Sequence, residues 1–271
     1  MIDVPPLFAG FVALLFGLLI GSFLNVCIFR LPNDYSVVGP RSYCPQCRRP
    51  IAWYDNIPVL SWFLLRGRCR QCRGRIRLRY PLVEAATGAL FFTIFYRYGA
   101  SLQALKLASF VALVIGLIVM DLEERVLPDE FTMGGLALGL VFAALVPFER
   151  GFVGLFLPHG WSVRLAAVVE AGIGAAVGGL VLWGVGVLYQ RIRGREGLGG
   201  GDPRMVAMTG AFLGLHGALA TVLIGSLLGS VVGLSYVAIA RKDAATYELP
   251  FGTFLGVAAL IVALIDPALP L

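Results

Sequence analysis

The sequence has little charge for its length, and this excludes most classes of soluble protein. Only 14% of its 271 residues are charged, whereas a soluble domain has roughly 25%. The chain is 58% hydrophobic, with a mean hydropathy of +0.84, which is typical of a polytopic membrane protein. It also lacks a long internal repeat and any low-complexity segment.

The N-terminal region lacks the features of a cleavable signal peptide. Its first apolar stretch, 7–29, is preceded by a single charge, Asp3, and by no basic residue. No small-residue cleavage site follows it. A stretch of 23 residues is long enough to cross about 30 Å of hydrocarbon. We therefore predict a first transmembrane helix here.

Seven further apolar stretches follow, so we expect an all-α polytopic membrane protein with about eight transmembrane helices. The run from 203 to 240 is too long for one span, and "LGLHGAL" (213–219) is its only polar break. We therefore predict two helices in that run. The expected stretches are 81–98, 102–120, 131–147, 164–189, 203–217, 218–240 and 252–267.

The positive charge is concentrated in the segment after the first apolar stretch. Eleven arginines lie from Arg30 to Arg79, against only Asp34 and Asp55. Cytoplasmic loops of membrane proteins are enriched in arginine, so we expect this loop in the cytoplasm and the N-terminus outside. This explains the net charge of +6 without nucleic acid as a partner. Alternation then puts 121–130 and 190–202 in the cytoplasm as well.

Glycines recur at four-residue spacing in the later apolar stretches. Such spacing allows helix backbones to approach closely within a bilayer. We interpret these glycines as helix-packing residues: Gly135 and Gly139; Gly174 and Gly178; Gly225, Gly229 and Gly233.

Four cysteines in the arginine-rich loop form the pattern CxxC-x21-CxxC: Cys44, Cys47, Cys69 and Cys72. Two CxxC turns can close a four-sulfur zinc site with no open position, so the metal would be structural. The alternative, disulfides or a redox pair, is disfavoured in the reducing cytoplasm. We predict a small zinc-stapled cytoplasmic domain between the first and second spans. Cys27, in the first span, is expected to be a buried apolar residue.

Acidic residues gather in two segments that the predicted topology places at the cytoplasmic edge. "IVMDLEERVLPDEF" (118–131) contains Asp121 at the end of the third span, and "GLGGGDPRM" (197–205) contains Asp202 at the start of the sixth. Two carboxylates a few ångströms apart cannot both ionise, so they share a proton. Such a pair can activate water against a peptide bond. Asp121 and Asp202 are therefore candidate catalytic residues.

Simpler roles are open for the same acids. Asp129 precedes an apolar run and fits a helix N-cap, as does Asp202, which is followed by Pro203. Glu123 and Glu124 fit solvated loop charges. A small transporter with an aspartate proton relay is another alternative, but relay carboxylates usually lie near mid-bilayer, often between inverted repeats.

Several short motifs follow one another along nearly the whole chain. They are "GSFLNVCIFRLP" (21–32), "DNIPVLSW" (55–62), "RYPLVE" (79–84), "LPD" (127–129), the Gly199-Gly200-Gly201-Asp202 sequence and "LPFGTFLG" (249–256). In this order they resemble the bacterial type IV prepilin peptidases, which are integral-membrane aspartic enzymes of the GxGD kind.

The resemblance implies a function and a division of the chain. The catalytic pair would be Asp202 of GxGD and Asp121, which lies eight residues before the aspartate of L-P-D. Family members cut the basic leader of type IV pilus prepilins and type II secretion pseudopilins after a glycine, at the cytoplasmic face of the bacterial inner membrane. Many then methylate the new N-terminus with S-adenosylmethionine. We thus expect a first transmembrane helix (1–29), a tetracysteine domain bearing the methyltransferase region (30–80) and a transmembrane peptidase core (81–271).

The resemblance leaves some residues and one activity open. Arg204 stands where the family commonly has lysine, and the two side chains differ in donor geometry. No Gly-rich motif identifies the residues that bind the methyl donor, although Gly67 in "LLRGRC" lies in a suggestive segment. A peptidase without methylation is thus an alternative. Glu123 and Glu124 are hypothesised to attract the basic leader.

Overall fold

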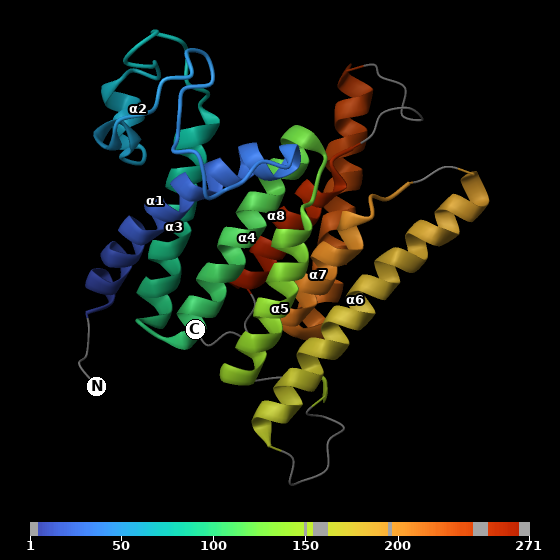
Figure 1. The fold of residues 1–271 in the computed structure, drawn as a ribbon. Coiled ribbons are helices and arrows are strands. Elements are labelled where there is room, and N and C mark those ends of the chain that lie inside the picture. The colour runs from blue at the N-terminus through green and yellow to red at the C-terminus, as the bar shows by residue number, and fades with distance from the viewer. Residues whose placement is uncertain (1–4, 149–150, 154–161, 195–196, 241–248, 266–271) are drawn as a thin grey trace. The chain divides into compact units, whose positions relative to one another are not determined.

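The computed structural model describes residues 5–148, 151–153, 162–194, 197–240 and 249–265, and nearly all their regular structure is helical (Figure 1). The chain forms two compact units, Met1–Gly116 and Leu117–Leu271, and α4 contributes to both. The α-helices are α1 (Pro6–Arg30), α2 (Leu60–Leu64), α3 (Arg79–Tyr98), α4 (Leu102–Glu124), α5 (Asp129–Leu145), α6 (Val163–Arg193), α7 (Gly201–Ala240) and α8 (Phe251–Ile265). Two short 3₁₀ helices, η1 (Leu31–Asn33) and η2 (Trp53–Asn56), lie between α1 and α2.

Each predicted apolar stretch coincides with helix in the structure. The two stretches expected at 203–217 and 218–240 both fall in α7, which is interrupted at Gly214 by the non-helical angles φ 74° and ψ −175°. This interruption lies inside "LGLHGAL", so the predicted division into two helices is confirmed. A positive φ is accessible to glycine at little cost, which explains why the break occurs there.

The membrane-spanning character is supported for part of the chain. Among the described residues, four helical stretches are long and apolar enough to cross a bilayer: Pro6–Asn33, Leu102–Glu124, Val163–Arg193 and Gly201–Gly233. The apolar helix α8 has 15 residues and is shorter than this requirement. These stretches fit a multi-pass membrane protein and account for four membrane-spanning helices by length and composition. The expected number of eight spans stays a prediction.

In the first unit, α1 and α3 pack closely because small residues face one another. A Cβ atom added to Gly17 would lie 2.9 Å from the Cα of Gly88, and one added to Gly21 would lie 2.7 Å from the Cα of Glu84. Cys27 is 2% exposed in the same unit, which confirms the prediction that it is buried.

Buried polar groups fix the segment that joins α1 to α3. The Asn25 amide donates to the backbone carbonyl of Tyr80 (3.1 Å), and Val59 donates its N–H to Glu84 (2.7 Å). The Arg30 guanidinium, 6% exposed, donates to two backbone carbonyls of the loop that follows α1. The loop is therefore attached at several points to the helices on either side.

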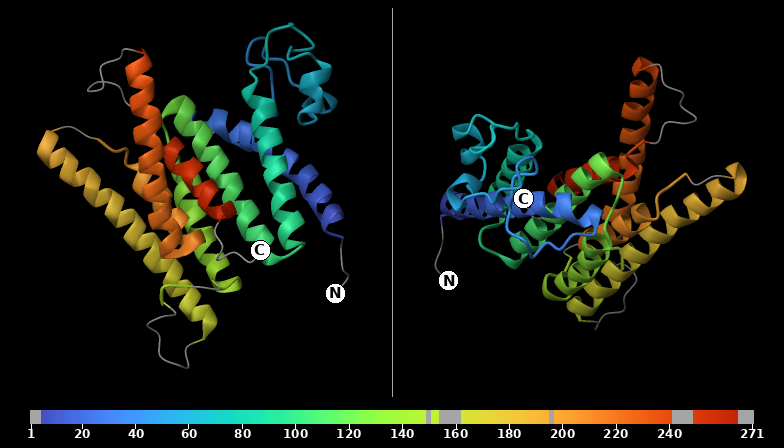
Figure 2. Two further views of the ribbon diagram at one scale, coloured as in Figure 1. Left: turned by 180° about the vertical axis from the view of Figure 1, so that it is seen from behind. Right: turned by 45° about the horizontal axis from the view of Figure 1, so that its top comes forward.

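In the second unit, α6 and α7 lie side by side (Figures 1 and 2). Their backbones meet where a Cβ on Gly174 would lie 2.8 Å from the carbonyl oxygen of Gly210 and 2.6 Å from the carbonyl carbon of Gly214. Similar close approaches occur at Gly139, which faces α7, at Gly178 and at Gly225, which faces α8. The predicted packing role is confirmed for Gly139, Gly174, Gly178 and Gly225.

The interruption of α7 is stabilised by a buried glutamate of α6. Glu170 is 3% exposed, and its Oε1 accepts the N–H of Leu215 (3.1 Å), directly after Gly214. Its Oε2 accepts the N–H of Val153 (2.8 Å). Glu170 thus satisfies two backbone donors that no helix satisfies.

Candidate functional site

Asp121 lies near the end of α4 and bonds to the first turn of α8. Its side chain is buried, and its Oδ2 accepts both the backbone N–H of Thr253 (2.6 Å) and the Thr253 hydroxyl (2.8 Å). The residue before α8 is Pro250, which has no side-chain acceptor. Asp121 therefore serves α8 as an N-terminal cap from a different helix.

Asp202 lies in the first turn of α7 and is also buried. Its Oδ2 accepts the backbone N–H of Gly199 (3.1 Å). The predicted N-cap role is therefore wrong in detail: α7 begins at Gly201, and the Asp202 carboxylate reaches back to the turn before the helix. The three glycines at 199–201 allow the chain to turn tightly before α7. The Asp202 carboxylate can therefore accept a hydrogen bond from a backbone N–H outside the helix.

The two aspartates lie near a common neighbour in the second unit. A Cβ on Gly201, beside Asp202, would lie 2.7 Å from the Leu127 Cβ, and one on Gly252, beside Thr253, would lie 3.0 Å from both Leu127 Cδ1 and Asp121 Cγ. In the described part of the chain, the hydrogen bonds to each carboxylate reach its Oδ2, which leaves both Oδ1 atoms for other partners.

The other predicted acids have different positions. Pro128 is the N-cap of α5, so the N-cap prediction for Asp129 is wrong by one residue. Asp129 instead pairs with the guanidinium of Arg204 at the start of α7. The pair joins the beginnings of two helices beside Asp202. Glu123 and Glu124 are exposed on the last turn of α4.

The four predicted cysteine ligands come together in the first unit. Their sulfur atoms all lie within 4.8 Å of one another, and those of Cys44 and Cys72 are 3.9 Å apart. Four sulfurs at about 2.3 Å from a tetrahedral zinc ion are about 3.8 Å apart, so the cluster fits such an ion. All five cysteines of the chain are free thiols. The cluster can therefore hold a metal ion.

The two cysteine turns have the same backbone geometry, which explains how they converge. In each turn the N–H of the first cysteine donates to the carbonyl five residues later, at 3.0 and 2.8 Å. The residue four positions later donates back to the cysteine carbonyl, at 2.8 and 3.0 Å. That residue has a positive φ in both turns, 57° at Arg48 and 59° at Arg73.

The thiols of the cluster differ in proton affinity. The pKa of Cys69 is lowered to about 7, chiefly because the backbone N–H of Cys72 bonds to its sulfur. For Cys72 the N–H of Gly74 acts in the same direction, but desolvation and the neighbouring thiols outweigh it and raise the pKa to about 11. Zinc binds thiolates, so metal binding at this cluster requires that protons be released.

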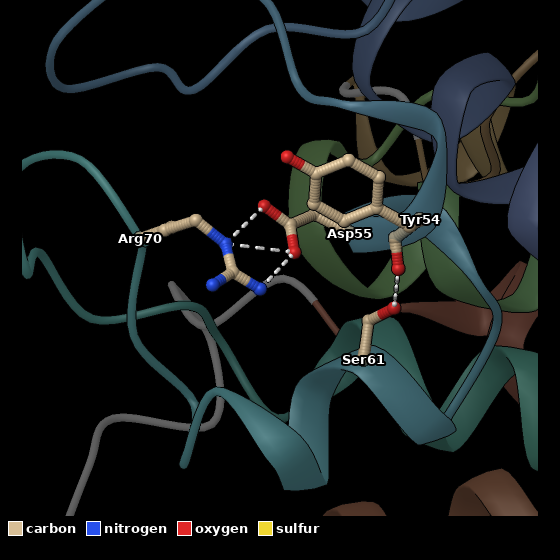
Figure 3. A network of polar contacts seen from close by, with 4 residues as sticks. All are labelled: Tyr54, Asp55, Ser61 and Arg70. Carbon is tan, nitrogen blue, oxygen red and sulfur yellow. Dashed lines mark hydrogen bonds and ion pairs between the residues drawn. The ribbon is translucent and has the colours of Figure 1, made fainter.

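Figure 3 shows how "DNIPVLSW" is held against the second cysteine turn. The Arg70 guanidinium donates to both carboxylate oxygens of Asp55, at 2.7–3.1 Å, and lies 5.6 Å from the centroid of the Tyr54 ring. The Ser61 hydroxyl donates to the Tyr54 carbonyl (3.0 Å). The segment between the two cysteine pairs is thereby fixed to the second cysteine turn.

A cavity of about 420 Å³ lies between α1 and the loop that follows it. Small-molecule sites commonly measure about 300–1,000 Å³. Its lining includes Phe23 and Val26 from α1 and Arg41, Trp53 and Asn56 from the loop. Among the described residues that line it, there are arginines but no acidic side chain. The cavity thus combines apolar, aromatic and cationic surface.

Gly67 does not line this cavity and has a local role in a turn. Its φ is 63°, and a Cβ there would lie 2.9 Å from the Trp62 ring. Its carbonyl accepts the N–H of Ile76 (2.8 Å), while the Trp62 indole donates to the Ile76 carbonyl (3.3 Å). Glycine is needed here because a side chain would meet both backbone strain and the indole.

Sequence reasoning missed the residues of α8 that contact Asp121. Thr253 and Gly252 belong to "LPFGTFLG", which was quoted for its resemblance without a role for any residue. The available signal was the start of an apolar run directly after a proline, which marks a helix N-terminus and therefore unpaired N–H groups.

Comparison with known proteins identifies relatives over most of the chain. Residues 15–98 match the bacterial peptidase A24 N-terminal domain, and residues 108–234 match the type IV leader peptidase family. Several relatives carry the name prepilin leader peptidase/N-methyltransferase, including the following three. The protein of Myxococcus xanthus is 42% identical over 229 residues, which cover 84% of this chain and 63% of that protein. Those of Pseudomonas putida and Neisseria gonorrhoeae are 36% and 33% identical, over 93% and 94% of this chain and 89% and 90% of their own. No solved structure matches this chain.

Proposed function

This chain belongs to the type IV leader peptidase family, and we propose that it removes the leader of type IV prepilins or pseudopilins and then methylates the new N-terminus. One observation carries the peptidase part of the proposal. Two buried aspartates from different helices, Asp121 and Asp202, lie beside Gly252 and Gly201, which both approach Leu127. Among the described residues, each aspartate accepts hydrogen bonds through one carboxylate oxygen, Oδ2.

The proposed reaction uses the aspartates as an acid and a base. A water molecule attacks the carbonyl carbon of the scissile amide, and its proton passes to the ionised carboxylate of Asp121. The protonated carboxyl of Asp202 donates its proton to the carbonyl oxygen. In the collapse of this diol intermediate, one hydroxyl returns its proton to the Asp202 carboxylate as the C=O bond re-forms and the C–N bond breaks. The leaving amine takes the proton from Asp121, so both carboxyl groups return to their starting states. Separation of roles between two carboxylates is the usual logic of such pairs.

We further propose that the protein lies in the bacterial inner membrane, with its N-terminus outside and with the helices predicted from the sequence as eight spans. Alternation from the arginine-rich loop then puts the end of α4 and the start of α7 at the cytoplasmic face. Prepilin leaders are basic and cytoplasmic, so this orientation brings a leader to the aspartates. Exposed Glu123 and Glu124 would attract its positive charge.

Zinc is the metal we propose for the cysteine cluster. The donor set supports it, because four thiolates are the ligands of structural zinc sites and leave no position for a substrate. The cluster would then hold the two cysteine turns, Arg70 and the "DNIPVLSW" segment in one rigid arrangement.

We place the methyl donor, S-adenosylmethionine, in the cavity beside α1. S-adenosylmethionine supplies the methyl group to the free amine. The Trp53 indole offers a face for its adenine, the Arg41 guanidinium a partner for its carboxylate, and the Asn56 amide hydrogen bonds. Phe23 and Val26 provide apolar surface for the first residue of a pilin helix.

Cleavage of a prepilin by purified Asp121→Asn and Asp202→Asn variants tests the peptidase. Asparagine has a similar shape but cannot carry the proton, so each rate should fall by about 10²- to 10⁴-fold. Asp34→Asn is the matched control, because Asp34 is exposed in a loop and its positive φ of 56° suits asparagine. Full activity in both aspartate variants would remove the catalytic assignment.

Binding of S-adenosylmethionine, measured by calorimetry, tests the methyltransferase site without depending on turnover. We expect Trp53→Ala to weaken binding at least about tenfold through the lost stacking. Trp183→Ala, an exposed tryptophan of α6, should bind normally. Equal affinity in both variants would exclude this cavity. If the wild type produces cleaved but unmethylated pilin by mass spectrometry, the protein is a peptidase alone.

A further inference from the structure

The segment "LPFGTFLG" has no role in the chemistry described so far, yet it contacts Asp121. α8 begins at Phe251, within this segment. Its third residue, Thr253, makes both of the hydrogen bonds that the Asp121 side chain accepts from described residues. Gly252 lies against the same carboxylate, since a Cβ there would be 3.2 Å from Asp121 Oδ1. The start of α8 therefore surrounds the carboxylate on one side.

The two donors of Thr253 converge on a single oxygen. The N–H reaches Oδ2 at 2.6 Å and the hydroxyl at 2.8 Å, whereas the hydroxyl is 3.3 Å from its other acceptor, the Ile118 carbonyl. An oxygen that accepts two hydrogen bonds is a poor position for a proton, because an added hydrogen would oppose the donors. The proton must then be exchanged at Oδ1.

We propose that Thr253 is a positioning residue for Asp121, which holds Oδ2 as an acceptor so that Oδ1 takes the proton from water. The inference rests on the proposed peptidase function and assigns a residue that acts through Asp121. Gly252 contributes to the same positioning of Asp121. Because it has no side chain, the carboxylate can approach the N–H of Thr253.

A purely structural role for the same contact makes different predictions. If Asp121 only capped α8, loss of the Thr253 hydroxyl would lower the unfolding temperature and leave the turnover of the folded enzyme unchanged. If Thr253 positions Asp121, the same loss would lower kcat with KM unchanged, because in this role the hydroxyl acts on the Asp121 carboxylate and not on the bound substrate.

The experiment compares Thr253→Val, which keeps the shape, with Thr253→Ser, which keeps the hydroxyl, in steady-state cleavage of a prepilin by the full-length protein. Loss of one hydrogen bond to a charged group should lower kcat of the valine variant about tenfold. The serine variant should retain the wild-type kcat. Thr209→Val is the control, because the buried Thr209 hydroxyl donates to the Met205 carbonyl of its own helix (3.0 Å).

Two further variants test whether the effect passes through Asp121. Gly252→Ala should lower kcat per folded molecule by displacing Asp121, since its Cβ would lie 3.0 Å from the Asp121 Cγ. Adding Thr253→Val to Asp121→Asn should cause no further loss of rate, since Thr253 acts through that carboxylate.

Each outcome has a distinct meaning. A normal kcat in Thr253→Val, or an equal loss in the valine and serine variants, overturns the positioning role while the proposed peptidase stands. Normal cleavage by Asp121→Asn overturns the proposed catalytic pair itself, and with it this inference.

Discussion

A carboxylate within a membrane-spanning helix is usually taken as functional. Glu170 of α6 tests whether such a carboxylate can instead stabilise the fold. The structure gives it two backbone donors instead, the N–H groups of Leu215 and Val153. Both donors lack a helical partner, since one follows the interruption of α7 at Gly214 and the other lies in the segment 151–153 before α6. We therefore expect Glu170 to affect stability and to leave the chemistry unchanged.

The magnitude follows from the number of donors left unsatisfied. Each buried N–H without a partner costs about 1–3 kcal/mol. Glu170→Gln keeps one acceptor oxygen and turns an NH₂ group toward the other N–H, so it should cost about 1–3 kcal/mol. Glu170→Ala loses both acceptors and should cost about 2–6 kcal/mol. For a protein of this size, Glu170→Gln should lower Tm by about 2–12 °C. Glu170→Ala should lower Tm by about twice as much.

Thermal unfolding in detergent measures the Tm of the wild type and of the two Glu170 variants. The cleavage rate per folded molecule is measured at a temperature at which every variant is folded. Glu130→Gln, an exposed glutamate in the first turn of α5, is the control and should unfold like the wild type. The reasoning is refuted if Glu170→Gln has the wild-type Tm, or if it loses activity while remaining folded.

Three further outcomes are expected. The purified protein should contain one zinc ion per chain by mass spectrometry, and the Cys44→Ser, Cys69→Ser double variant should contain none, because two sulfurs cannot close the site. Arg204→Ala should lower the free energy of unfolding by less than about 1 kcal/mol in a denaturant titration, because both partners of its ion pair are exposed. Gly174→Ala should lower Tm in a thermal melt, since its Cβ would meet the backbone of α7, whereas Gly172→Ala, with open space around it, should not.

The lengths of the apolar stretches, and the charged or turn residues that bound them, were sufficient to predict the long helices. Hydrophobic runs bounded by charged or turn residues define where a helix can be buried, and the break in the longest run coincides with the only non-helical residue of α7, Gly214. The number of spans was less accessible. α5 has 17 residues and α8 has 15. Both helices are apolar, but both are shorter than the roughly 20 residues that cross the hydrocarbon core of a bilayer.

The site was predictable only where spacing along the chain carries the information. The four cysteines form two CxxC pairs, and this repeated spacing predicted that their sulfurs converge. In the structure, the two pairs lie in turns of equal backbone geometry. The partners of the acids come from distant segments: Thr253 is 132 residues from Asp121, and Arg204 is 75 residues from Asp129. No local pattern encodes such pairs, so the N-cap assignments for Asp129 and Asp202 followed propensity and were wrong in detail.

The geometry of the two aspartates explains why capping and catalysis need not compete. A carboxylate has two oxygens, and in both residues one of them, Oδ2, accepts backbone hydrogen bonds that fix the side chain. Among the described residues the other oxygen accepts no hydrogen bond, which leaves it for the proton exchange that we propose. Asparagine retains the accepting oxygen and loses only the exchange, so it isolates chemistry from structure, whereas alanine would remove both. A variant series of Asn and Ala at each position should therefore show equal loss of cleavage but a fall in Tm only for alanine.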